Sequence, residues 1–205
     1  MKYLRIIFLV SALSFATAAL AQGSGAAASS SAPQAQTTQQ PAPSISGAID
    51  QQVSMVERNL VGAAEAMPED KYNFTPSSLN IKGAAYGDVR TFAQLIKHTA
   101  AANYRFWSSI SGEKMPDNIK GSNGPDELKS KAEIVQFLKD SFAVGHRAAK
   151  ALTAENMLEE VPLFGGRKAP KLFVASFTAI HAADEYGQVV EYLRMNGITP
   201  PASQR

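Results

Sequence analysis

Three side chains in this sequence have the chemical types and the spacing to bind one metal ion. His181 and Glu185 lie one helical turn apart, so both can point toward a single ion. His98 lies on another predicted helix and would complete a set of two histidines and one carboxylate. Such a set leaves coordination positions open for water or substrate, and it suits Zn²⁺, Fe²⁺, Mn²⁺ or Ni²⁺. The same spacing also occurs in exposed helix neighbours and in core histidines that bind no metal.

Four other residues are weaker candidates for a role at this site. Asp184 follows His181 by three residues and is a rival carboxylate at the other edge of the same helix face. Tyr186 and Gln188 are candidates for contacts with the metal ligands or with a substrate. His146 flanks the apolar face of a different predicted helix.

The helix that carries His181 has an unusually polar inner face. Steps of four, four, three and four residues place the following side chains on one face: Phe177, His181, Glu185, Gln188 and Tyr192. A face that enters a helix-bundle core loses hydration around its His, Glu and Gln side chains. This cost favours a functional purpose for the face.

Composition excludes several other classes of function. The sequence has no cysteine, which excludes disulfides, a thiol nucleophile and cysteine-ligated metal clusters. No Gly-x-Ser-x-Gly elbow and no phosphate-binding P-loop occur. The chain has 20 Lys and Arg against 18 Asp and Glu. Because Lys2 and Arg5 supply the whole excess, the chain without its first 21 residues is neutral, and we expect no nucleic-acid partner.

Four amphipathic segments follow a stretch without apolar periodicity. The first is an apolar stripe that ends before Pro68: Ile49, Val53, Val56, Leu60, Ala63 and Met67. Capping-box patterns, Thr91 with Gln94 and Ser130 with Glu133, predict the starts of the second and third helices. The fourth helix is predicted from Pro170 to about Asn196, with Gly197 as its cap.

These segments predict an all-α fold, a four-helix bundle over residues 46–205. Strand patterns are nearly absent, although residues 159–170 are typical of a turn or a small hairpin. A long connection, residues 69–90, separates the first two helices, which argues against a simple up-down-up-down order.

The N-terminal residues predict export. Residues 1–21 have a charged start, a short apolar run and Ala19-Leu20-Ala21, which together are typical of a secretory signal peptide. The alternative, a membrane anchor, needs a longer apolar run. We expect cleavage after Ala21, a periplasmic or secreted bacterial protein, and no stable membrane insertion afterwards. Residues 22–45 are rich in Ala, Ser, Pro and Gln, which predicts a disordered tether.

The fourth helix and its ending resemble a known family. Residues 181–203 (HAADEYGQVVEYLRMNGITPPAS) resemble the C-terminal signature of the DinB-like (DinB/YfiT) superfamily, which is His-x-x-x-His-x-Gly-Gln followed by Tyr-Leu-Arg, Gly and Pro-Pro. Residues 67–76 are similar to the family's connection after its first helix. Residues 91–98 are similar to the stretch that carries its first metal histidine. The resemblance covers about residues 48–203.

The resemblance implies a four-helix bundle with an unusual helix order, often dimeric, that holds a divalent ion with three histidines. His98 and His181 match the first two of these ligands, and Glu185 stands where the third histidine is expected. A carboxylate still binds these metals, but it adds negative charge and changes the metal preference. Some members are similar to transferases that move a small thiol onto an electrophile.

Two functions therefore remain open. One is an exported metal-dependent hydrolase or thiol transferase that acts on a small molecule at His98, His181 and Glu185. The alternative is a non-catalytic envelope module for binding or interaction, which kept the bundle and lost the metal. In that alternative, Glu185 would hydrogen-bond to His98 or His181. A purely structural envelope domain on a tether is a third, weaker hypothesis.

Overall fold

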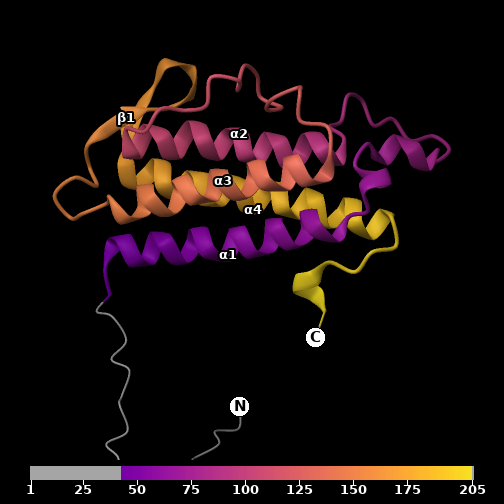
Figure 1. Cartoon of the computed structure of the whole chain (residues 1–205), viewed down its shortest axis with the longest axis horizontal. Helices are drawn as coiled ribbons and strands as arrows, with labels where there is room; N and C mark the ends of the chain where they lie inside the picture. Colours follow the sequence, from indigo (N-terminus) through magenta and orange to yellow (C-terminus); the bar gives the residue numbers. More distant parts are fainter. Residues whose placement is uncertain (1–42, 205) are drawn as a thin grey trace, which may run out of the picture. The chain divides into compact units, whose positions relative to one another are not determined.

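The computed structural model describes residues 43–204, so the predicted signal peptide and nearly all of the predicted tether lie outside the described residues. Within this part of the chain, four long helices pack together (Figure 1). They are α1 (Ile45–Ala66), α2 (Phe92–Ser111), α3 (Lys131–Lys150) and α4 (Lys171–Met195). The predicted all-α four-helix bundle is confirmed.

The helix starts follow the predicted capping chemistry. At α2, the Thr91 hydroxyl accepts the Gln94 backbone N–H, and the Gln94 side chain accepts the Thr91 N–H. Ser130 and Glu133 form the same reciprocal pair at α3. Each box satisfies backbone donors that the first helical turn leaves without a partner. Both predicted capping boxes are therefore confirmed.

The core lies between the four helices. All six residues of the predicted α1 stripe are buried, each at most 4% exposed. Trp107 of α2 is fully buried and packs against α3 at Gly145, where an added Cβ would lie 3.0 Å from the indole Nε1. The absence of a side chain at Gly145 therefore lets α2 and α3 approach closely. Phe137 of α3 is only partly buried.

The helices do not pack in sequence order. α1 packs on α3 and α4, and α2 also packs on α3 and α4. Consecutive helices α1 and α2 therefore lie across the bundle from each other. α1 and α4 run in one direction, while α2 and α3 run in the other (Figure 1). This order confirms that the bundle is not a simple up-down-up-down arrangement. The α1–α2 connection contains two short 3₁₀ turns, η1 (Glu69–Lys71) and η2 (Pro76–Leu79).

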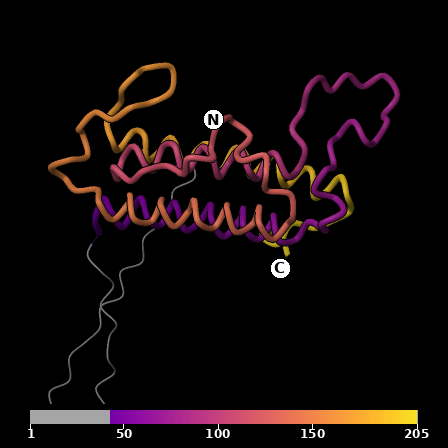
Figure 2. Tube along the Cα trace, turned by 45° about the horizontal axis from the view of Figure 1, so that its top comes forward, coloured from indigo at the N-terminus to yellow at the C-terminus, as the bar shows by residue number. Residues whose placement is uncertain are grey.

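A second long connection, residues 112–130, runs back along α2 to reach the start of α3 (Figure 2). Lys97 of α2 holds it in place, because the buried ammonium donates to the Pro125 carbonyl at 2.9 Å. Gly124 has a φ of +69°, and an added Cβ there would lie 3.0 Å from the Lys97 carbonyl oxygen. The connection therefore lies directly against α2, which brings Ser122 and Asn123 to the helix that carries His98.

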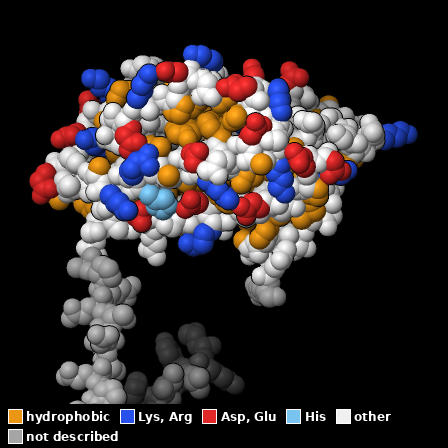
Figure 3. Space-filling model, viewed as in Figure 1, with side chains coloured by type: hydrophobic (Ala, Val, Ile, Leu, Met, Phe, Trp, Pro, Cys, Tyr) orange, Lys and Arg blue, Asp and Glu red, His pale blue; other side chains and the backbone are white. Residues whose placement is uncertain are grey.

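Residues 159–170 contain the expected small hairpin. β1 (Glu160–Pro162) pairs antiparallel with β2 (Lys168–Pro170), with Val161 opposite Ala169. The turn η3 (Phe164–Gly166) joins them, and η4 (Pro201–Ser203) packs on α1 near the C-terminus. Among the described residues, no helix is both long and apolar enough to cross a membrane. Figure 3 shows acidic and basic side chains interspersed over the visible face.

Candidate metal centre

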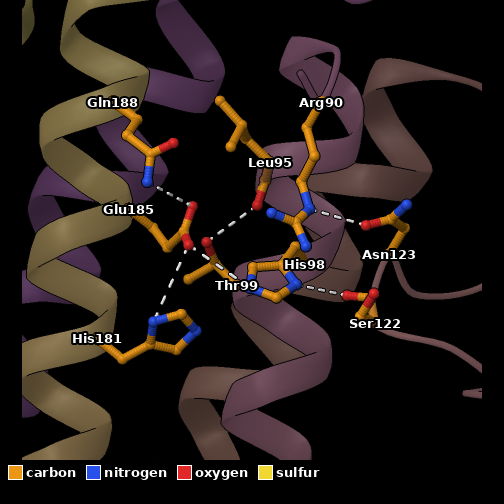
Figure 4. A network of polar contacts seen from close by, with 9 residues as sticks. All are labelled: Arg90, Leu95, His98, Thr99, Ser122, Asn123, His181, Glu185 and Gln188. Atoms are coloured by element: carbon orange, nitrogen blue, oxygen red, sulfur yellow. Dashed lines mark hydrogen bonds and ion pairs between the residues drawn. The ribbon is translucent and has the colours of Figure 1, made fainter. Parts of the chain in front are cut away.

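The structure brings together His98, His181 and Glu185. His98 comes from α2, and the other two come from α4, which packs directly on α2. One ligand atom from each residue lies within 4.8 Å of the other two. Figure 4 shows the two imidazole rings and the carboxylate turned toward a common point between the helices.

The spacing of these atoms suits a shared ion better than direct hydrogen bonds. Glu185 Oε1 lies 3.5 Å from His98 Nε2 and 3.9 Å from His181 Nδ1. Both distances are too long for hydrogen bonds. Two ligands bound to one tetrahedral zinc ion are about 3.3 Å apart, given bonds of roughly 2.0–2.1 Å. The hydrogen bond from Glu185 to either histidine, which the metal-free alternative predicts, is not made.

His98 is oriented by the connection between α2 and α3. Its Nδ1 lies 2.6 Å from the backbone carbonyl oxygen of Ser122. A carbonyl oxygen only accepts, so Nδ1 carries the proton and Nε2 keeps its lone pair. This lone pair is on the nitrogen that lies nearest Glu185. A backbone carbonyl on the distal nitrogen is the usual way in which proteins fix a metal-binding histidine.

Burial acts on the charge of all three groups. Glu185 is 4% exposed, and burial raises the pKa of its carboxyl group, although the nearby Arg90 cation opposes this. Burial also lowers the pKa of His98 and of His181, which keeps both imidazoles neutral at pH 7. Among the described residues, the two histidines are the only basic groups within ion-pair distance of Glu185. Two neutral nitrogen donors beside a buried carboxylate are a donor set that fits a divalent cation.

Polar side chains form the rim of this cluster. Gln188 Nε2 donates to Glu185 Oε2 in a long contact of 3.4 Å. Arg90 Nε donates to Asn123 Oδ1 at 2.8 Å, and the Tyr192 hydroxyl donates to the Arg90 carbonyl at 2.8 Å. Gln188 was a candidate from the sequence, whereas Arg90 and Asn123 were not. Both lie in connections, outside the helical periodicity that identified the other residues.

The remaining candidates lie outside the cluster. Asp184 is exposed and contributes no ligand atom to it. Tyr186 is partly buried against the core. His146 instead contacts α1, with Nδ1 2.7 Å from Asp50 Oδ1 and Nε2 2.9 Å from Glu57 Oε2. Its role in the structure is therefore to join α3 to α1.

Comparison with a protein family agrees with the fold. No curated protein matches the chain. The sequence model of the DinB superfamily matches residues 52–189, which include α2, α3 and all three residues of the cluster. Since this match spans well over half of the sequence, the protein belongs to the DinB superfamily.

Proposed function

We propose that the protein binds a divalent metal ion through His98, His181 and Glu185 and acts on a small molecule at an open coordination position. The observation that carries the proposal is the buried Glu185 carboxylate, which faces two neutral imidazoles at 3.5 and 3.9 Å. An ionised carboxylate loses most of its hydration there, and a cation between the three groups offsets that loss.

The reaction class follows from the ligand set. When bound, a divalent ion supplies Lewis acidity, which makes a water molecule or a thiol nucleophilic near neutral pH. The Ser122 carbonyl keeps the His98 proton on Nδ1, and Gln188 contacts the second oxygen of Glu185. These contacts support metal binding, and the activity that we propose for the bound ion is that of a hydrolase or a thiol transferase. We also propose that the chain is exported, as residues 1–21 predict.

Elemental analysis of residues 22–205, purified without a histidine tag, tests the metal site. We expect near-stoichiometric Zn, Fe, Mn or Ni in the wild type and loss of metal in His98→Ala and Glu185→Ala. Asp184→Ala is the matched control, because this exposed neighbour lies outside the cluster and its variant should keep the metal.

A folded wild-type protein that stays metal-free after incubation with each of the four ions would contradict the proposal. Circular dichroism of every variant separates loss of metal from loss of fold. The metal-free result would favour the alternative, a non-catalytic module built on the same bundle.

A further inference from the structure

A polar cleft opens beside the metal cluster. Its volume is about 570 Å³, and its lining includes Arg90, Gln94, Ser122, Asn123 and Gln188. Two of these residues also contact the cluster, since the Ser122 carbonyl binds His98 and the Gln188 side chain contacts Glu185. A molecule in the cleft therefore lies next to the metal ligands.

Arg90 gives the cleft a fixed positive charge. Its side chain is half-buried, and its Nε is bound to Asn123 Oδ1 at 2.8 Å, which restrains the plane of the guanidinium (Figure 4). Among residues 43–204, no carboxylate lies within ion-pair distance of Arg90, and neither Nη group has a hydrogen-bond partner. A guanidinium presents its Nη donors in a planar fork that matches two oxygens of one carboxylate or phosphate.

The neighbouring amides add further donors. Asn123 uses its oxygen to accept from Arg90, so its amide NH₂ remains a donor. Gln94 uses its oxygen to accept the Thr91 N–H, which leaves its NH₂ group as a donor too. Of the described residues that line the cleft, Asp88 alone is acidic, and it is exposed and makes no ion pair with Arg90. Arg90, Asn123 and Gln94, all partly buried, therefore supply donors to the lining, and the Gln188 amide oxygen remains an acceptor.

We propose that this cleft binds an oxyanion group of the substrate, a carboxylate or a phosphate, with Arg90 as its main contact. The rest of the substrate then extends over His98, His181 and Glu185. The substrate class is thus a small anionic molecule. Its reaction rests on the proposed metal function, whereas binding of the oxyanion does not require the ion.

Nuclear magnetic resonance on metal-free protein tests the proposal directly. The protein is titrated with sodium phosphate and, separately, with sodium acetate, while sodium chloride keeps the ionic strength constant. We expect saturable shifts of the Arg90 Nε–H and Asn123 NH₂ resonances with at least one of the two anions. The two arms show whether the cleft prefers phosphate or carboxylate.

Variants separate direct contact from general electrostatics. Arg90→Gln should weaken anion binding by at least about tenfold, because a charge-assisted hydrogen bond is lost. The affinity of Arg90→Lys should lie between those of Arg90→Gln and the wild type. In Arg90→Gln, binding is followed at the Asn123 NH₂ resonance. Arg105→Gln is the matched control: this exposed arginine of α2 also acts on His98 through its charge, but it does not line the cleft. It should change the affinity by less than about twofold.

Two results would overturn the inference: no saturable shift in the wild type with either anion, or equal affinities in the wild type and folded Arg90→Gln. The His181→Ala variant keeps the two proposals distinct, because it lacks a metal ligand and retains Arg90. If the metal proposal fails, oxyanion binding in the wild type and His181→Ala still stands. If metal binds and no oxyanion does, only this inference fails.

Discussion

At the scale of single residues, the unusual feature of the candidate site is a buried carboxylate, Glu185. A carboxylate in this position is buried without a cationic side chain in ion-pair contact, and the two histidines beside it are neutral. In the absence of a cation, such a group lowers the stability of the folded state. A bound cation, as we propose, would offset this loss, and measuring stability with and without zinc tests it.

Glu185→Gln should stabilise the metal-free protein and remove its response to zinc. The amide keeps the shape of the side chain but carries no charge to desolvate, so we expect a gain of roughly 1–2 kcal/mol in the free energy of unfolding at pH 7. Added zinc should raise the stability of the wild type and leave the variant unchanged. Urea unfolding with EDTA, and separately with zinc, measures both effects. Asp184→Asn serves as the exposed control, and a less stable metal-free Glu185→Gln would refute the argument.

At the scale of elements, the helices could be predicted from sequence, whereas the contacts that the connections make with the site could not. The α1 stripe and both capping boxes depend on local spacing, so the pattern alone identified them. His181 and Glu185 share one helix, and periodicity placed them on one face. Ser122 acts through its backbone carbonyl, which no residue type reveals. Arg90 directly precedes the cap of α2. It lies beside Asn123 because the connection of residues 112–130 runs back along α2.

The pairing of α1 with α3 shows a second use of histidine in this fold. His146 lies between Asp50 and Glu57, with a carboxylate oxygen within 2.9 Å of each ring nitrogen. Both nitrogens donate only when the ring is protonated. Burial by itself lowers the pKa of His146, but the hydrogen bonds to Glu57 and Asp50 outweigh it and raise the pKa above its usual value.

The raised pKa predicts that the bundle loses stability in alkaline solution. The contribution of His146 is present in full below the ordinary histidine pKa of about 6.5, and it is lost as pH rises through the raised value in the folded state. Since the three side chains are partly exposed, we expect a loss of only about 1 kcal/mol between pH 6 and pH 9. Urea unfolding in EDTA measures this loss as the difference between the wild type and His146→Gln. An equal difference at both pH values would count against ion pairing of protonated His146 with Asp50 and Glu57.

At the scale of the whole molecule, the helix order places the two histidine clusters between different helix pairs. The candidate metal ligands lie where α2 meets α4, while the His146 pairing lies where α3 meets α1. The chain needs two long connections, because α1 and α2 lie across the bundle from each other and α2 and α3 run in the same direction. The second connection supplies Ser122 and Asn123 to the site. Among residues 43–204, the hydrophobic core and its packing partners begin at Ile45.

The last prediction concerns the whole chain and its export. When the whole chain is produced in a bacterial host, we expect the periplasmic fraction to contain residues 22–205, beginning at Gln22, because Ala19 and Ala21 supply the small residues at the cleavage site. Intact-mass spectrometry identifies that product. Ala21→Lys places a long charged side chain at the cleavage site and should leave the precursor uncut in the membrane fraction. Recovery of the uncut wild-type chain from the cytoplasm would show that residues 1–21 are not a signal peptide.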